Sequence, residues 1–374
     1  MIAPKLRFKA DDGNDFPELE AKSLFDICEY RNKQSVGKNY VGTENMKQNF
    51  SGLESLDEET EMKGVCYSKG DTLMSNIRPY LRKTWKADRE GVCSTDVLVF
   101  HPIDVASEYL HYLIASDKFI SYVMTGAKGV KMPRGDKEHM MKFSIMVPSL
   151  PEQQKIADFL STIDTIIEKQ QATVSAWEER KKGVMQKLFS QEVRFKADDG
   201  SDFPDWEEKE VKDVCSVATG KSNTQDKVDS GKYEFYVRSP IVEHSDKYLF
   251  DEEAVITVRD GVGTGKVFHY VNGKYNLHQR CYRMYDFMGV IGKYFFYFFS
   301  QNFYRRIKAM SAKTSVDSVR MEMITKMKMN VPSLPEQQKI ADCLSALDTV
   351  IQKQKETLER WQELKKGLLQ QMFV

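Results

Sequence analysis

The stretch Val147–Gln170 reads VPSLPEQQKIADFLSTIDTIIEKQ, and Val331–Gln354 repeats it as VPSLPEQQKIADCLSALDTVIQKQ. A shorter phrase also occurs twice, upstream of each long one: RFKADDGNDFP starts at Arg7 and RFKADDGSDFP starts at Arg194. The regions between these phrases share little sequence similarity. The chain therefore consists of a duplicated unit. Its repeated segments, which we call the frame, are nearly identical in the two copies, while the regions between them, which we call the filling, differ. This predicts an internal pseudo-two-fold repeat.

Each long phrase has the pattern of a capped helix that continues as a coiled coil. Ser149–Glu152 and Ser333–Glu336 have the S-x-x-E spacing of a capping box. Apolar residues then alternate at intervals of four and three, the spacing of a heptad seam. Because the two seams match, we expect the helices to pack antiparallel, each about 58 Å long at 1.5 Å per residue. The seam residues are Ile156, Leu160, Ile163, Ile167 and Trp177 in the first helix and Ile340, Leu344, Leu347, Ile351 and Trp361 in the second.

Two positions in each seam are polar: Gln170 and Lys181 in the first helix, Gln354 and Lys365 in the second. Polar residues in a seam can fix the register of the helices at some cost in stability. They can equally face solvent where the helices diverge. The sequence leaves both alternatives open.

The variable regions have the pattern of α+β domains. Strand-like runs occur at Val97–Phe100 and Val255–Val258, and more helical runs follow at Tyr109–Ile120 and Lys293–Phe303. The predicted fold is therefore two α/β domains separated by two long antiparallel coiled-coil helices. Its parts are an entry segment at 1–17 that packs near the last helix, a first domain at 18–148, a first long helix at 149–190, a second entry segment at 191–204, a second domain at 205–332 and a second long helix at 333–374.

Composition limits the functions open to the chain. Its 374 residues include 55 Lys and Arg and 55 Asp and Glu, so the formal net charge is zero. Binding to nucleic acid must then rest on a local basic face. The six cysteines are scattered singly, without the paired spacing of a zinc site. No apolar stretch is long enough to span a bilayer, and we expect a cytoplasmic protein.

The sequence contains no recognisable catalytic constellation. Arg259–Lys266 is rich in glycine but lacks the length and the Ser or Thr of a phosphate loop, and it is interpreted as a turn that lets backbone approach a partner closely. Asn76–Tyr80 departs from the Asn-Pro-Pro-Tyr motif of adenine methyltransferases at its second and third positions. The histidines show no metal-ligand spacing. We therefore expect no catalytic residue, no metal and no cofactor in this chain.

Basic side chains interleaved with polar and aromatic ones gather in both variable regions. Such residues suit phosphate positioning and the reading of guanine by arginine. The alternative is an ordinary solvated surface, because Lys and Arg are mostly exposed. The candidate DNA-binding residues are Arg78, Arg82, Lys83, Lys131 and Arg134 in the first region and Arg238, Arg259, Lys266, Lys313 and Arg320 in the second.

The doubled phrase P-x-L-P-E-Q-Q-K-I-A-D, at Pro148 and Pro332, is similar to the conserved-region signature of type I restriction–modification specificity subunits. The entry segments ending in Phe-Pro also resemble that family, as does Gly70-Asp71-Thr-Leu upstream of Arg78. The resemblance covers the whole chain. It implies a non-catalytic subunit with two target-recognition domains, each reading one half of a split, asymmetric DNA sequence.

The same resemblance implies a set of partners. The long helices are expected to fix the gap between the half-sites and to dock two copies of an adenine-N6 methyltransferase subunit. S-adenosylmethionine is then expected in that partner, and a motor–endonuclease subunit completes the complex. Two alternatives from other classes stay open: a coiled-coil scaffold with no role on DNA, and a self-contained DNA methyltransferase or nuclease.

Overall fold

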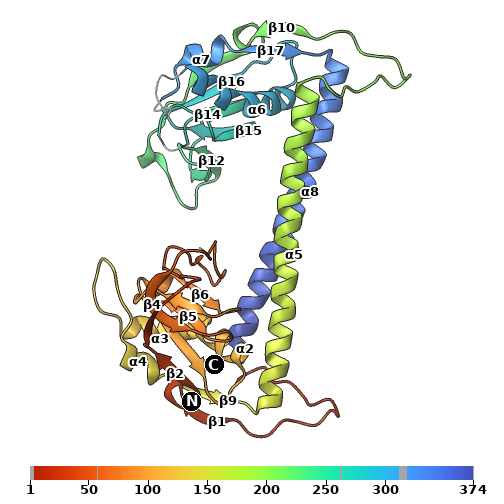
Figure 1. Ribbon diagram of the computed structural model, residues 1–374. Coiled ribbons are helices and arrows are strands. Elements are labelled where there is room, and N and C mark those ends of the chain that lie inside the picture. The colour runs from red at the N-terminus through yellow and green to blue at the C-terminus, as the bar shows by residue number, and fades with distance from the viewer. Residues whose placement is uncertain (1–3, 57, 262, 311–317, 374) are drawn as a thin grey trace. The chain divides into compact units, whose positions relative to one another are not determined.

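The computed structural model describes residues 4–56, 58–261, 263–310 and 318–373. The chain forms two compact units, the first made of Met1–Gln171 with Glu356–Val374 and the second of Ala172–Lys355. Two long helices, α5 (Leu150–Phe189) and α8 (Leu334–Met372), are each divided between the units. In both units a stretch of α5 lies beside a stretch of α8 (Figure 1). The two long, mutually packed helices predicted from the heptad pattern are therefore confirmed.

The first unit is a mixed α/β domain. Its strands are β1 (Glu20–Ser23), β2 (Cys28–Arg31), β3 (Gln34–Gly37), β4 (Met62–Tyr67), β5 (Thr72–Ser75), β6 (Thr84–Lys86), β7 (Gly91–Cys93), β8 (Val97–Pro102) and β9 (Ser144–Val147), and its further helices are α1 (Leu24–Ile27), α2 (Ser107–Ile114), α3 (Asp117–Thr125) and α4 (Lys137–Met141). One sheet has the order β2-β8-β5-β6 and another the order β3-β4-β7, while β1 pairs with β9.

The second unit is built on one larger sheet. Its strands are β10 (Glu207–Glu210), β11 (Ser216–Thr219), β12 (Tyr233–Tyr236), β13 (Glu243–Ser245), β14 (Phe250–Val258), β15 (Phe268–Leu277), β16 (Cys281–Tyr285) and β17 (Lys328–Val331), and its further helices are α6 (Gly292–Met310) and α7 (Met321–Thr325). Six strands have the order β11-β16-β14-β15-β12-β13, and β10 pairs with β17 as β1 pairs with β9.

The strand and helix predictions inside the domains hold. The runs at Val97–Phe100 and Val255–Val258 lie in β8 and β14. The run at Lys293–Phe303 lies in α6. The run at Tyr109–Ile120 is divided into α2 and α3, because Ser116 starts a new helix by accepting a hydrogen bond from the backbone N–H of Phe119 at 3.2 Å.

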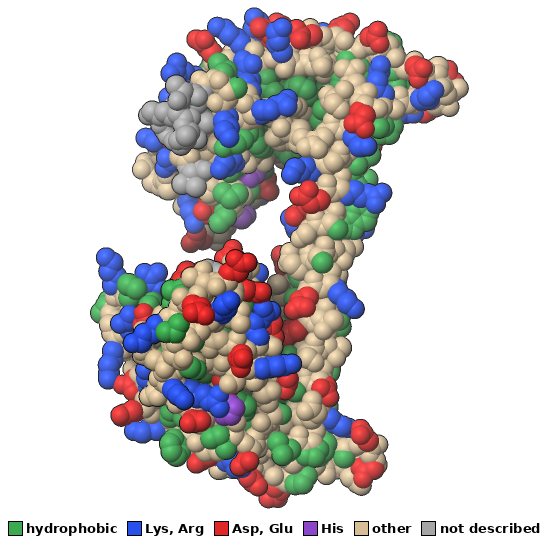
Figure 2. Space-filling view, in the orientation of Figure 1, with side chains coloured by type: hydrophobic (Ala, Val, Ile, Leu, Met, Phe, Trp, Pro, Cys, Tyr) green, Lys and Arg blue, Asp and Glu red, His purple; other side chains and the backbone are tan. Residues whose placement is uncertain are grey.

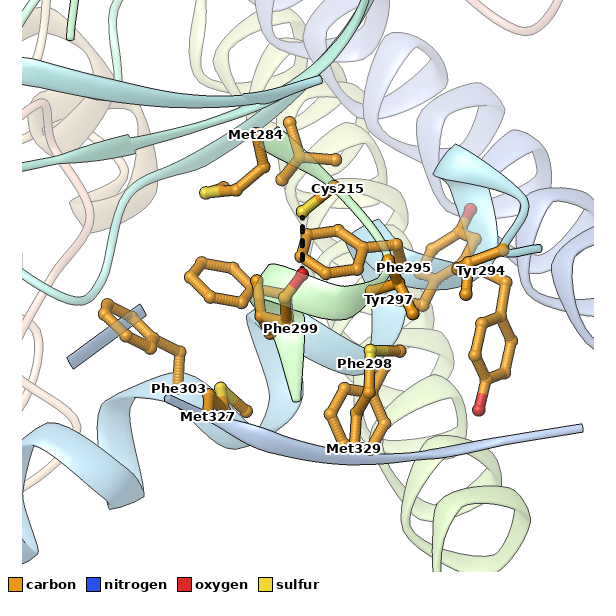
Figure 3. Packing of buried hydrophobic residues seen from close by; sticks show 14 of the residues in the cluster. Cys215, Met284, Tyr294, Phe295, Tyr297, Phe298, Phe299, Phe303, Met327 and Met329 are labelled. Atoms are coloured by element: carbon orange, nitrogen blue, oxygen red, sulfur yellow. Dashed lines mark hydrogen bonds between the residues drawn. The ribbon is translucent and has the colours of Figure 1, made fainter. Parts of the chain in front are cut away.

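The second unit has an aromatic core into which the long helices run. Figure 3 shows Phe295, Phe299 and Phe303 stacked along α6, with ring centroids 5.5 and 4.4 Å apart for successive pairs. The seam residues Ile340 and Leu344 of α8 belong to the same buried cluster. In the first unit the corresponding Ile156 and Leu160 of α5 likewise join the domain core. The ends of the heptad seams therefore anchor each domain to its helices. The other predicted seam residues lie on α5 (Ile163 buried, Ile167 and Trp177 half-buried) and on α8 (Ile351 buried, Leu347 and Trp361 half-buried).

The repeated glutamate at the start of each long helix is buried and paired with the arginine of the repeated entry segment. Arg7 donates to both carboxylate oxygens of Glu152, with the shorter contact 2.6 Å long. Arg194 does the same to Glu336, at 3.0 and 2.8 Å. Both glutamates are at most 1% exposed. The same two arginines also donate to the backbone carbonyls of Pro17 and Pro204.

This pairing makes the capping-box prediction wrong. The hydroxyl oxygens of Ser149 and Ser333 are buried without a hydrogen-bond partner in the parts of the chain described. A bidentate arginine–carboxylate contact is about twice as strong as a neutral hydrogen bond, so the glutamates face the arginines instead of the helix start.

The glutamine that follows each buried glutamate ties the helix to its domain. Gln153 accepts from the backbone N–H of Ala106 and donates to the carbonyl of Pro148. Gln337 accepts from the N–H of Ile291 and donates to the carbonyl of Pro332. The entry segments also contact the helices further along. Lys155 and Lys339 reach the carboxylates of Asp11 and Asp198, and the N–H groups of Lys5 and Leu6 donate to the carbonyl of Gln371 in α8.

A lysine in each seam bonds an aspartate of the other helix. Lys181 of α5 pairs with Asp348 of α8, and Tyr297 donates to the same carboxylate at 2.7 Å. In the first unit Lys365 pairs with Asp164, to which Tyr112 donates at 2.8 Å. Each lysine also lies over the ring of the tyrosine in its own cluster. The two clusters are equivalent by the sequence repeat, which favours a role for these lysine positions in setting the register of the antiparallel helices.

Removal of an entry-segment arginine should destabilise its unit strongly. Arg7→Ala leaves the Glu152 carboxylate buried without its partner, and we expect the free energy of unfolding to fall by about 3 kcal/mol. Arg194→Ala should cost less, because Glu336 still accepts from the indole N–H of Trp206 at 3.0 Å. Urea unfolding measures both. Lys328→Ala, which removes an exposed pair with Glu208, is the control and should change stability by less than about 1 kcal/mol; equal effects in all three would contradict this account.

The lysine–aspartate pairs should show energetic coupling. In a double-mutant cycle of Lys365→Met and Asp164→Asn, we expect a coupling of about 1 kcal/mol in urea unfolding, because both side chains are less than a third exposed. The exposed pair Lys182–Glu179 on α5 serves as the comparison and should show coupling near zero. If the seam pair were no more coupled than this surface pair, a role in fixing register would be excluded.

Candidate nucleic-acid interface

In the first unit the candidate residues come from two segments that bond to each other. The turn after β5 holds Arg78 and Arg82, both in the left-handed conformation, with φ of 51° and 55°. The backbone N–H of Arg78 donates to the carbonyl of Pro133 at 2.8 Å, and Ile77 forms a bridge with Arg134. The structure therefore brings these basic residues together from positions more than fifty residues apart.

Several of these basic groups already have partners. The Arg82 guanidinium lies 2.7 Å from the carboxylate of Asp117, and that of Arg134 lies 3.1 Å from Asp96. The Lys83 ammonium donates to the carbonyl of Thr43. Lys131 is exposed, and no bond from its side chain to another described residue is observed. Arg82 and Arg134 are 40% and 55% exposed and keep guanidinium N–H groups free for another acceptor.

In the second unit the candidates converge on one aspartate. Asp260, directly after Arg259 at the end of β14, accepts from Arg238 at 3.3 Å and from Arg280 at 3.4 Å. Arg259 is exposed, and its backbone bonds Arg280 and Val319. Arg280 was not among the ten candidates. In the sequence it is only one of many basic residues of this region, and it is the fold that places its turn, between β15 and β16, beside Asp260.

This arginine cluster creates a positive local potential. The pKa of the His278 imidazole is lowered, first by burial and then by the charges of Arg238 and Arg280. Its Nδ1 accepts from the backbone N–H of Arg280, so the ring is fixed in its neutral form. The His278 imidazole therefore adds no positive charge to this arginine cluster.

The remaining candidates of the second unit are more dispersed. The Lys266 ammonium lies over the ring of Tyr304 at 5.5 Å. Arg320 is exposed at the start of α7. Lys313 lies outside the described residues.

The glycine-rich turn has an internal packing reason. Gly265 has a φ of +68°, and a Cβ there would lie 2.1 Å from the Cδ1 of Ile307 in α6. A residue with a side chain would be strained at this positive φ and would force the Ile307 side chain to move. The glycine thus lets the turn that carries Lys266 lie directly on α6.

The described side chains offer geometry for binding and not for metal chemistry. Within the described ranges, no group of three or more His, Cys, Asp or Glu side chains could hold a metal ion. None of the helices described has the length and apolar character needed to cross a membrane. What the loops do present is arginine side chains, a residue type that can position phosphates and read base edges.

A family model for the type I restriction modification DNA specificity domain matches residues 17–175 and again residues 204–360. The chain belongs to this family. Both copies of the domain span a variable region and the start of a long helix, as the repeat predicts. The predicted family and the predicted role of a recognition subunit, as opposed to an enzyme, are confirmed.

Relatives and solved structures agree with this specificity family. The chain is 25% identical over 310 residues to the type I restriction enzyme MjaVIII specificity subunit of Methanocaldococcus jannaschii, which covers 75% of this chain and 73% of that protein. It is 23% identical over 411 residues to the putative type I restriction enzyme MjaX specificity subunit of the same organism, with 97% and 94% covered.

The fold of a type I restriction-modification S subunit from M. genitalium matches with a TM-score of 0.63 at 12% identity, covering 100% of this chain and 99% of that one. A chain from a structure of type I restriction-modification complex assembly matches with a TM-score of 0.56 at 18% identity, covering 95% and 97%. At these identities the matches concern the fold. Membership of the specificity family makes DNA and the other subunits of a type I system the partners of this chain.

Replacement of Arg259 should weaken DNA binding by the assembled complex. If Arg259 contacts a phosphate, Arg259→Ala reduces the slope of log affinity against log salt by about one. Arg78→Ala tests the first unit in the same way. Both are measured by fluorescence anisotropy over a salt series, with Lys328→Ala as a charge-matched control. Unchanged affinity at moderate salt for both arginine variants would remove them from the interface.

Proposed function

We propose that each unit reads one half of a split DNA target and that the two half-sequences differ. The observation that carries this proposal is the contrast between frame and filling. In both units the repeated arginine binds the repeated glutamate, and the repeated glutamine binds the backbone of its own domain. The sheets that carry the basic loops differ, with four and three strands in one unit and six in the other. Two different readers on one repeated frame imply an asymmetric target.

The charge distribution supports recognition that depends on partners. A chain of zero net charge has little general attraction for DNA. Four of its exposed arginines, Arg134, Arg238, Arg259 and Arg280, lie in loops of the two domains, and all of these except Arg259 are paired with an aspartate. We infer that these side chains give orientation and base selection, while other subunits supply part of the affinity.

The repeated frame supports a proposal on those subunits. Leu150 and Leu334 occupy equivalent positions and are 55% and 52% exposed. Neither leucine is therefore part of the hydrophobic core of its own domain. Equivalent exposed residues suit two copies of one partner. We propose that this partner is an adenine-N6 methyltransferase subunit that holds the S-adenosylmethionine. A motor–endonuclease subunit completes the complex, and the assembly acts on DNA in the cytoplasm.

The decisive experiment is to express the chain with its modification partner and to map methylated adenines across a genome. A bipartite motif with two different halves and a fixed gap is expected. A continuous motif would contradict the proposal. If the complex bound its partners and protected no DNA in footprinting, a scaffold role would be favoured. Binding of S-adenosylmethionine by the isolated chain would favour a self-contained methyltransferase.

We further propose that the paired long helices set the gap between the half-sites. Removal of one heptad from Ile156–Leu188 together with the equivalent heptad of α8 shortens the pair by about 10 Å, or about three base pairs. The methylation map should then show the same two half-sequences with a shorter gap. A removal of four residues, which breaks the seam, is the control and should abolish methylation. Altered half-sequences in the heptad variant would overturn the spacer role.

A further inference from the structure

The segment between α3 and α4 forms a narrow hairpin. Lys128 and Arg134 exchange two backbone hydrogen bonds, each 2.9 Å long. Gly129, with a φ of +95°, begins the turn. Figure 1 shows this segment as a loop that projects from the first unit. The chain therefore presents a short, narrow hairpin loop, closed by one β-bridge, whose tip stands away from the domain.

The root of the hairpin is firmly held. The carbonyl of Pro133 accepts from the N–H of Arg78, and the Arg134 guanidinium pairs with Asp96. Behind the root, Gly135 lies so close to its neighbours that a Cβ would be 2.0 Å from the Cε of Met140. The Lys128 ammonium bonds Asp136 at 2.6 Å. The hairpin is fixed to the turn that carries Arg78, so its direction is set by the candidate interface.

The tip of this hairpin is apolar and uncovered. Val130 is 101% exposed and Met132 is 49% exposed. Lys131 lies between them and is exposed as well. Single exposed apolar residues are ordinary, but here they occupy the end of an anchored projection with basic residues on both sides. Figure 2 shows apolar and basic side chains together on this part of the first unit.

We propose that the hairpin Lys128–Arg134 enters the major groove of DNA and that Val130 contacts base edges of the first half-site. This inference rests on the proposed function. The major groove, about 12 Å wide, admits a two-stranded ribbon, and the C5-methyl of thymine is an apolar feature that a valine can recognise. Lys128, Lys131 and Arg134 then face phosphates on the groove walls. The basic flanks favour a polyanion over an apolar protein surface as the occupant.

Val130→Ser tests the contact without disturbing the fold, because the side chain touches nothing in its own unit. Assembled complexes carrying Val130→Ser are compared with the parent by competition binding to targets substituted at each position of both half-sites. We expect discrimination at one position of the first half-site to fall about fourfold or more, from the loss of buried methyl groups. The second half-site should be read unchanged. Val36→Ser, at an exposed valine on β3 of the same unit, is the matched control.

Lys131→Ala tests the phosphate contact beside the tip. It should weaken binding to all targets about equally and reduce the salt slope by about one, leaving the preferred sequence unchanged. This separates positioning from reading within one hairpin.

The outcomes distinguish this inference from the function on which it rests. If the parent complex methylates a bipartite target and Val130→Ser behaves like Val36→Ser, the hairpin does not read bases and the inference fails alone. If Val130→Ser instead loses a partner subunit in gel filtration, the tip is a protein contact and the inference is overturned. If the parent complex recognises no bipartite target, the proposed function itself fails.

Discussion

The buried carboxylate at the start of each long helix is the constraint on which the rest of the structure depends. Glu152 and Glu336 have almost no exposed surface, and a buried carboxylate is tolerated only when it is paired and hydrogen-bonded. The partner is an arginine more than 140 residues earlier in the chain. The entry segment must therefore return to the helix start, and the domain between them becomes an insertion whose two ends are fixed at one place.

This arrangement explains why the entry segments and the starts of the long helices are nearly identical in the two copies, while the domains between them are not. Strand pairs β1–β9 and β10–β17 close the insertion a second time, next to the buried pair. Gln153 and Gln337 then bond the backbone of the inserted domain, which requires no particular side chain from it. Any sheet whose ends meet at the helix can occupy the position. The two different sheets of this chain are two solutions to that one constraint, and their loops are free to diverge toward different targets.

The sequence predicted what depends on periodicity and missed what depends on distant partners. The heptad pattern was sufficient for α5 and α8, because a seam of apolar residues is a local signal. The function of Lys181 was left open, because its partner Asp348 lies 167 positions away. The capping-box prediction was wrong for the same reason. The spacing of Ser149 and Glu152 fits a cap, and only the fold shows that the Glu152 carboxylate accepts hydrogen bonds from Arg7 instead. At the candidate interface, the basic residues could be listed, but the aspartates that pair with them could not be assigned.

Those aspartates change what the arginines can do. Asp260 holds Arg238 and Arg280, and Asp96 holds Arg134. An arginine beside an aspartate gains less from a lone phosphate than a free arginine does, because the carboxylate repels the phosphate as it approaches. General attraction to DNA is thereby reduced, while each guanidinium is biased toward one direction before binding. Arginines that are held in this way favour a target whose base edges match their geometry over one that merely offers charge, which is the balance that a specificity subunit of zero net charge requires.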